Sequence, residues 1–176
     1  MAQSVELIFD PATENALRVE WDRLADAGLP SCRRSQPDPD NRPHLTLYAA
    51  ETISAEADER LPALFAGLEL SLRIGGLMIF GPRHGQVILV RLVVPSTELL
   101  VLQSRTARLC GADALGQFGA GGWTPHITLA RRMGVDQLGV AINVLGGSGA
   151  ELAGVVRHCR RWDGQRRTVR WLSTPG

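Results

Sequence analysis

The sequence contains no lysine, so all 19 of its basic residues are arginines. Arginine presents a planar fork of N–H donors that suits phosphate groups, although a bias in genomic composition explains a complete absence of lysine more simply. Net charge is also small, because 18 acidic residues leave a formal charge of +1. The charges are unevenly spread: residues 1–90 hold 8 Arg against 13 Asp and Glu, whereas residues 91–176 hold 11 Arg against 5 Asp and Glu.

Cysteine is scarce, and its three positions form no recognisable pattern. Cys32, Cys110 and Cys159 are odd in number, widely spaced and without a Cys-x-x-Cys pair, which argues against a disulfide framework or a thiolate zinc site. Long apolar runs are missing too, since none approaches the roughly 18 residues of a membrane span. The first seven residues lack a basic region and include Glu6, unlike a signal peptide. We therefore expect reduced thiols, a cytoplasmic location and no membrane contact.

Aromatic residues make up only 5% of the chain. Proteins that bind long single-stranded RNA stack its bases on aromatic side chains, so this scarcity argues against long RNA as a ligand. The 176 residues are 44% hydrophobic and 21% charged, which suits one compact domain over residues 1–176, or two small lobes that share one core.

Hydrophobic periodicity predicts a mixture of helices and strands without the steady alternation of a doubly wound sheet. The predicted helices cover residues 13–29, 54–68, 96–110 and 136–145. The predicted strands cover residues 5–9, 42–49, 70–80, 86–94, 124–131, 151–162 and 165–172. Short Gly and Pro connections predict two hairpins, one around residues 81–85 and one at Asp163-Gly164. The order favours an α+β fold with mostly antiparallel sheets.

Two predicted strands carry nearly the same five residues. Pro43-His44-Leu45-Thr46-Leu47 is repeated as Pro125-His126-Ile127-Thr128-Leu129, with the histidines 82 residues apart. The chain has four histidines, and two of them occupy the same place in this repeat. An internal repeat of this kind indicates either a shared functional role or a duplicated structural hairpin.

Alternation along a strand places His44 and Thr46 on one face and the intervening leucine on the other. The same holds for His126 and Thr128, so two imidazoles and two hydroxyls can converge in one cleft. Histidine titrates near neutrality, and one ring can act as a base while the other acts as an acid in phosphoryl transfer. The threonine hydroxyls can hold the non-bridging phosphate oxygens. This scheme needs no metal ion and no cofactor.

At these residues the chain resembles the 2H phosphoesterase superfamily, and within it the bacterial 2′-5′ RNA ligase and RNA 2′,3′-cyclic phosphodiesterase group. The resemblance implies two pseudo-symmetric lobes with helices outside and an active site in the cleft between them. It implies that His44 and His126 are catalytic and that Thr46 and Thr128 bind phosphate. The implied reaction opens a 2′,3′-cyclic phosphate, on an RNA 3′ end or a nucleotide, to a 2′-phosphate without a metal.

Four residues beside the motifs are candidates for substrate binding. Arg42 and Tyr48 share the histidine face by alternation, and the alternative for them is a solvated arginine and a half-buried tyrosine. Arg131 suits a phosphate, but alternation places it opposite His126 unless a bulge intervenes. Trp123 could stack on a base or belong to the core. The loop at 31–42 is long enough to reshape the substrate entrance.

Three functions remain open at this stage: hydrolysis of the cyclic phosphate, ligation of RNA through a 2′-5′ bond by the reverse reaction, and RNA binding without catalysis. In the hydrolytic direction we assign His126 as the base and His44 as the acid, although the pseudo-symmetry leaves the two assignments nearly equal. A basic strip in the C-terminal hairpin motivates the binding function, with a solvated hairpin face as the alternative. Its members are Arg157, Arg160, Arg161, Arg166, Arg167 and Arg170. The oligomeric state is open, and a monomer is favoured.

Overall fold

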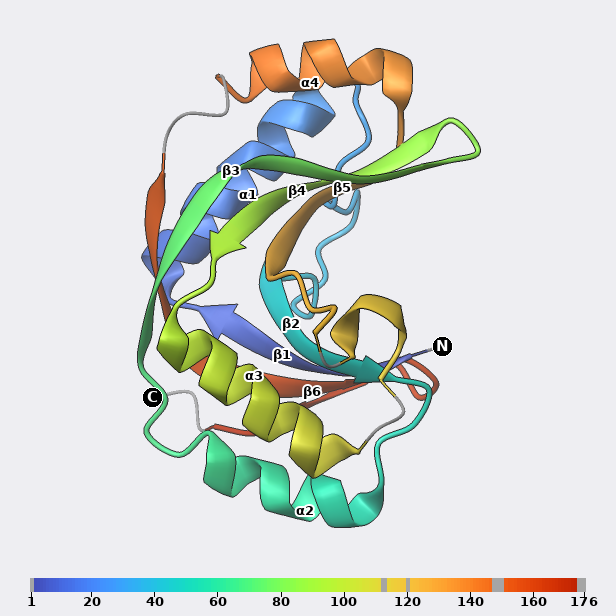
Figure 1. Cartoon of the computed structure of the whole chain (residues 1–176). Helices are drawn as coiled ribbons and strands as arrows, with labels where there is room; N and C mark the ends of the chain where they lie inside the picture. Colours follow the sequence, from blue (N-terminus) through green and yellow to red (C-terminus); the bar gives the residue numbers. More distant parts are fainter. Residues whose placement is uncertain (1, 112–113, 120, 147–150, 174–176) are drawn as a thin grey trace.

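The computed structural model describes residues 2–111, 114–119, 121–146 and 151–173. Over these residues the chain forms four α-helices and seven strands, and the expected α+β class is confirmed (Figure 1). The helices are α1 (Pro11–Asp26), α2 (Ala55–Leu64), α3 (Thr97–Cys110) and α4 (Leu138–Val144). The strands are β1 (Gln3–Phe9), β2 (His44–Ala50), β3 (Leu70–Arg83), β4 (Gln86–Val94), β5 (His126–Gly134), β6 (Leu152–Asp163) and β7 (Thr168–Trp171).

Each of the three longer helices begins at a side chain that caps its first turn. The Asp10 carboxylate accepts a hydrogen bond from the backbone N–H of Thr13 at 3.1 Å, just before α1. Ser54 and Ser96 cap α2 and α3 in the same way. These caps satisfy N–H groups that have no partner inside the helix, and they explain why the helices begin where the sequence places a short polar residue.

The seven strands form one antiparallel sheet in the order β1-β2-β5-β4-β3-β6-β7. β6 pairs with β3 through residues 152–156 and with β1 through residues 156–163, so the sheet closes on itself. On the other side, β2 and β5 are joined by a single residue pair, Leu45 with Ile127. The sheet is therefore divided into two parts, one formed by β1, β2 and β7 and one by β3, β4 and β5, with β6 running along both.

Two hydrophobic cores lie behind these two parts of the sheet. The larger core packs α2 and α3 against β1, β2 and β6, with Leu7 and Leu61 fully buried. The smaller core packs α1 and α4 against β4 and β5, with Leu24 and Leu129 fully buried. The two pairs of helices lie at opposite ends of the molecule in Figure 1. This arrangement confirms the expected two lobes with helices outside.

The main differences from the sequence prediction are at connections. α1 begins two residues earlier than predicted, because Asp10 caps it, and ends before Gly28, whose φ is +72°. β3 continues to Arg83, and the turn is made by His84 and Gly85, both with positive φ. The predicted turn at Asp163-Gly164 is wider, because Asp163 pairs with Thr168 and leaves a connection of residues 164–167.

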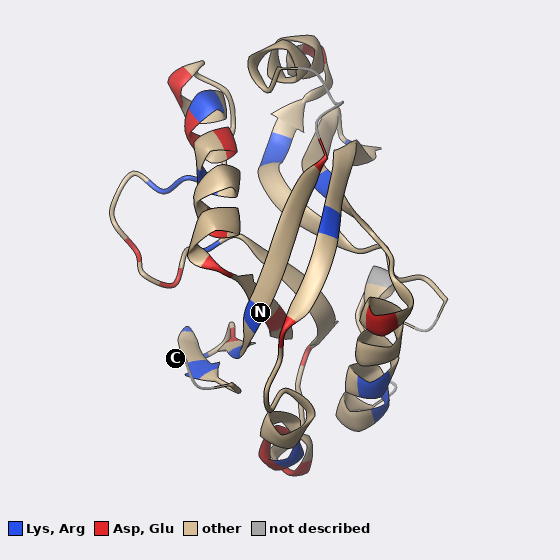
Figure 2. Ribbon diagram, turned by 90° about the vertical axis from the view of Figure 1, so that its left-hand side faces the viewer, with Lys and Arg blue, Asp and Glu red and all other residues tan. Residues whose placement is uncertain are grey.

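The C-terminal arginines do not form a free basic strip. Arg160 and Arg161 are each 4% exposed and pair with Glu6 and Asp58. Arg157 pairs with Glu69 at 3.1 Å, and Arg170 shares Asp58. Figure 2 shows the same mixing of charge elsewhere, with acidic and basic residues interspersed along α1 and the loop that follows it. Among the described helices, none has both the length and the apolarity needed to cross a lipid bilayer.

The closed part of the sheet depends on β1, which lies between β2 and β6, and this predicts where stability is most sensitive. Leu7→Ala should lower the free energy of unfolding by about 2–5 kcal/mol, because it opens a cavity in a fully buried strand. Val19→Ala, on the exposed side of α1, should change it by less than about 0.5 kcal/mol. Urea denaturation measures both, and equal losses would contradict this description of the core.

Candidate functional site

The two copies of the repeated motif meet in one small cavity. His44 and Thr46 at the start of β2, and His126 and Thr128 at the start of β5, line a space of about 130 Å³. The antiparallel pairing of Leu45 with Ile127 lies between the histidine and the threonine of each motif. The structure therefore brings together the four residues of the two motifs, and four more residues complete the lining. These are Phe80, Ile88, Phe118 and Arg131.

Each histidine is fixed by its own strand in the same way. The Nδ1 atom of His44 lies 2.7 Å from the carbonyl oxygen of Arg42, and that of His126 lies 2.7 Å from the carbonyl oxygen of Thr124. A carbonyl oxygen can only accept, so Nδ1 donates its proton in both rings. The Nε2 atom of each ring is then available for proton transfer to or from a ligand.

A tryptophan supports each motif from outside the cavity. The indole N–H of Trp123 donates to the carbonyl oxygen of Thr46 at 3.0 Å, and that of Trp21 donates to the carbonyl oxygen of Thr128 at 3.1 Å. Trp123 also packs against the larger core and does not line the cavity. Trp123 therefore lies where the core alternative placed it, and base stacking by Trp123 stays a prediction.

A β-bulge follows the threonine in both strands. In β2, Thr46 pairs with Glu6 and Tyr48 pairs with Val5, so Leu47 is the extra residue. In β5, Thr128 pairs with Val90 and Ala130 pairs with Leu89, so Leu129 is the extra residue. A bulge puts two residues of one strand opposite one of its neighbour, and it reverses the alternation of side chains beyond it.

The two bulges explain the outcome for two of the predicted binding residues. Arg131 lies on the cavity side of β5 after the bulge and lines the site, as the sequence allowed only if a bulge intervened. The prediction that Tyr48 shares the histidine face is wrong for the same reason. Tyr48 is fully buried in the larger core, and its hydroxyl donates to the carbonyl oxygen of Gly111 at 3.2 Å.

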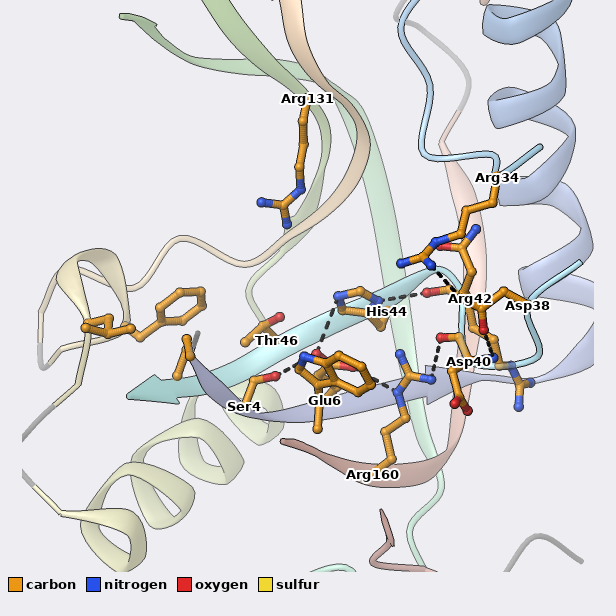
Figure 3. Close-up of a pocket in the computed structure, with 16 residues that line it drawn as sticks. Ser4, Glu6, Arg34, Asp38, Asp40, Arg42, His44, Thr46, Arg131 and Arg160 are labelled. Atoms are coloured by element: carbon orange, nitrogen blue, oxygen red, sulfur yellow. Dashed lines mark hydrogen bonds and ion pairs between the residues drawn. The ribbon is translucent and has the colours of Figure 1, made fainter. Parts of the chain in front are cut away.

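A larger cavity of about 520 Å³ opens beside His44 (Figure 3). It shares four lining residues with the smaller cavity, and much of its remaining wall comes from the loop at 34–42. The shared residues are His44, Thr46, Phe118 and Arg131. Its lining residues from that loop are Arg34, Asp38, Asp40, Asn41 and Arg42. The long loop therefore forms part of the wall of this cavity, and its effect on a substrate entrance stays a prediction.

Arg42 lies at the rim of this larger cavity and is not free. Its guanidinium forms an ion pair with Glu14 of α1, and it lies 5.6 Å from the ring centre of Trp171. Only 24% of its side chain is exposed. Arg42 is thus not a solvated arginine, because its guanidinium already has partners within the protein. It anchors the end of the loop beside His44.

The surroundings of the two histidines differ in charge. Burial lowers the pKa of His126, the neighbouring Arg131 and His44 lower it further, and the carbonyl oxygen of Thr124 only partly opposes them. The ring of Phe80 stands edge-on to His126 at 4.8 Å between centroids. His126 is therefore neutral near neutral pH and ready to accept a proton.

His44 instead has an acidic neighbour that the sequence analysis did not select. The Nε2 atom of His44 lies 3.7 Å from Oε1 of Glu6 on β1. Burial raises the pKa of Glu6, but His44, Arg160 and the Ser4 hydroxyl outweigh it and hold the pKa below its usual value. A usable signal was present in the sequence, because Glu6 is the one charged residue in this fully buried strand. No cluster of three or more potential metal ligands occurs among the residues that the structure describes.

Comparison with known proteins gives one family and several similar folds. Residues 13–156 match the family model described as the 2′-5′ RNA ligase superfamily. Usb1 of Kluyveromyces marxianus is similar with a TM-score of 0.61 and 11% identity, covering 97% of each chain. TT0787 of Thermus thermophilus has a TM-score of 0.59 and 18% identity, covering 98% of this chain and 95% of the other. LigT of E. coli, complexed with 3′-AMP, has a TM-score of 0.54 and 15% identity, covering 96% and 91%.

At these identities the solved structures establish the fold. No curated protein sequence matches the chain. The similarity extends over nearly the whole of each protein.

The position of Arg131 predicts its effect on anion binding. Arg131→Gln should weaken the binding of inorganic phosphate about tenfold, because one charge-assisted contact is lost from the cavity. Arg132→Gln is the matched control, since Arg132 is the adjacent exposed arginine and does not line the cavity. Titration calorimetry measures both affinities. An equal loss in the two variants would indicate only a general effect of positive charge.

Proposed function

The chain belongs to the 2′-5′ RNA ligase superfamily, and from this premise we propose that it is a metal-independent phosphodiesterase that opens 2′,3′-cyclic phosphates at the end of RNA or on a nucleotide. The product is a 2′-phosphate. The family match confirms, at the level of the superfamily, the resemblance to 2H phosphoesterases that the sequence motifs indicated. One observation carries the proposal: two imidazoles from separate lobes line a single phosphate-sized cavity in unlike surroundings.

The unlike surroundings support different roles for the two rings. His126, whose pKa is lowered, takes a proton from water at Nε2 as the water oxygen attacks phosphorus. The bond from phosphorus to the 3′-oxygen breaks, and His44 gives its Nε2 proton to that oxygen. One proton is accepted and one donated, so the step balances and leaves the phosphate on the 2′-oxygen. Each proton transfer contributes roughly 100- to 10,000-fold in rate.

The phosphate is held by groups on both strands. The hydroxyls of Thr46 and Thr128 and the guanidinium of Arg131 surround the cavity, and they can donate to the non-bridging oxygens where charge must be stabilised. The leaving 3′-oxygen carries the ribose, so the nucleoside must lie on the side of the acid. The larger cavity opens beside His44, which supports the assignment of His44 as the acid.

The fold relatives support a nucleotide as the ligand. LigT of E. coli has been solved with 3′-AMP, and Usb1 of Kluyveromyces marxianus with uridine monophosphate. A mononucleotide is also the size of ligand that the 520 Å³ cavity suits. We treat residues 1–176 as one catalytic domain of two lobes, and a cytoplasmic monomer stays a prediction.

The two alternative functions have less support. Ligation through a 2′-5′ bond would use the same site in reverse, but water is abundant, so hydrolysis should dominate unless a second RNA end is held firmly. A non-catalytic RNA-binding function rested on the C-terminal arginines. Four of those six arginines form ion pairs within the protein, so the strip offers little free positive charge.

The proposal predicts that each motif histidine is indispensable. With a nucleoside 2′,3′-cyclic phosphate and EDTA present, the wild type should hydrolyse the substrate to the 2′-phosphate, and His44→Ala and His126→Ala should each lose at least about 100-fold in kcat. His84→Asn is the control, because His84 lies in an exposed turn with positive φ, which asparagine tolerates. Product analysis by chromatography decides the outcome. Full activity in either alanine variant contradicts the mechanism.

The environment of His126 predicts the acid side of the pH profile. A lowered pKa keeps the base form present at lower pH, so the ascending limb of kcat/KM should lie below the ordinary histidine value of about 6.5. Phe80→Ala should admit water around the ring and move this limb to higher pH, because burial is the main cause of the lowering. Ile79→Ala, on the exposed neighbour, should leave it in place. A wild-type limb above 6.5 would contradict the assignment.

A further inference from the structure

The two halves of the site match closely but differ in one residue of the neighbouring strand. Thr46 of β2 pairs with Glu6 of β1, and Thr128 of β5 pairs with Val90 of β4. Both halves otherwise repeat the same features, namely the motif histidine, the motif threonine, the β-bulge after it and the tryptophan that supports the strand. A buried carboxylate thus occupies one half where the other half has an aliphatic side chain.

The carboxylate of Glu6 is held on both of its oxygens. Arg160 donates from Nε to Oε2 at 2.9 Å, and the Ser4 hydroxyl donates to Oε1 at 2.6 Å. Oε1 is also the atom that lies 3.7 Å from Nε2 of His44. Figure 3 shows Glu6 between the His44 ring and the Arg160 guanidinium. Glu6 is only 5% exposed, so water screens this contact weakly.

Stability alone does not account for this arrangement. Burying an ion pair costs desolvation that its attraction often fails to exceed, and an apolar pair of similar volume is frequently as stable. Val90 demonstrates that an aliphatic residue fits the equivalent position of this fold. The charged pair of Glu6 and Arg160 is therefore better explained by an effect on its neighbour than by its contribution to folding.

We propose that Glu6 is a positioning residue for His44: its carboxylate is the counter-charge that keeps the His44 ring protonated and ready to donate, while Arg160 and Ser4 hold Glu6 ionised and in place. This inference rests on the proposed function. It gives the two pseudo-equivalent rings different tasks, because His44 faces an anion while His126 faces Arg131 and an aromatic ring.

The other charged groups around His44 make this counter-charge necessary. Arg131 and His126 face it from β5, Arg160 from β6, and Arg34 and Arg42 line the cavity from the loop. The guanidinium groups among them would each oppose a proton on the ring. Two further carboxylates, those of Asp38 and Asp40, line the larger cavity. Asp38 forms an ion pair with Arg34 at 2.8 Å. Among the described acidic side chains, only that of Glu6 lies within 4.0 Å of a His44 ring nitrogen.

The test is Glu6→Gln, which keeps the size of the side chain and removes its charge. NMR titration should show the His44 ring losing its proton at lower pH than in the wild type. The alkaline limb of the rate profile on a nucleoside 2′,3′-cyclic phosphate should move to lower pH, with about a tenfold loss of rate on the alkaline side of the optimum.

Glu20→Gln is the matched control. Glu20 pairs with the buried Arg91 outside the site, with side chains 15% and 7% exposed. Removing its charge disturbs a comparable buried pair, so stability should fall as it does in Glu6→Gln. Neither the His44 titration nor the alkaline limb should move.

Glu6→Gln leaves Arg160 buried without its partner and could unfold the protein, so a double variant, Glu6→Gln with Arg160→Met, is made in parallel. It removes the anion and one opposing cation together, so the pH at which His44 loses its proton should lie between those of the wild type and the single variant. Identical His44 titrations in the wild type and in every folded Glu6 variant would overturn the proposal. The NMR readout needs no turnover, so an inactive wild type would refute the proposed function while the titration still decides the role of Glu6.

Discussion

The site depends on one contact, the antiparallel pairing of Leu45 in β2 with Ile127 in β5. Each of these residues lies between the histidine and the threonine of its motif. In an antiparallel pair, the residues before and after such a contact follow in reverse order, so this register sets His44 opposite Thr128 and His126 opposite Thr46. Because the ladder is limited to this one pair, the strands diverge on either side, and the polar side chains line a cavity.

A symmetric scaffold of this kind can bring two imidazoles together but cannot make one an acid and the other a base. The difference must come from residues outside the repeat. Arg131 has Ala49 as its counterpart after the bulge, and Glu6 has Val90 as its counterpart on the neighbouring strand. Cation and aromatic ring lie beside one histidine, and the carboxylate lies beside the other. The repeat thus sets the geometry of the two histidines, and the residues that differ between the two halves determine which histidine donates a proton and which accepts one.

The sequence was sufficient to predict the element order, the antiparallel α+β class and the convergence of the two motifs, because these follow from periodicity and a close local repeat. The sequence was not sufficient to predict which face of a strand a side chain occupies beyond a β-bulge, where one extra residue reverses the alternation. Strict alternation of side chains placed Tyr48 in the site and Arg131 outside it. The bulges at Leu47 and Leu129 reverse the two placements. The sequence also did not reveal partners that lie far apart along the chain. Arg160 was interpreted as part of a basic strip or a solvated face, because its partner Glu6 lies 154 residues away.

Arg160 also links the charge at His44 to the shape of the substrate entrance. Its Nε donates to Glu6, and its guanidinium also donates, from Nη1 at 2.8 Å, to the backbone carbonyl oxygen of Asp40 in the loop that walls the larger cavity. A lysine ammonium on a flexible stem lacks the fixed fork that serves two acceptors in one plane. Whatever its origin in composition, the exclusive use of arginine has a physical consequence here, because one buried guanidinium holds both the loop beside the nucleoside cavity and the carboxylate beneath the proposed acid.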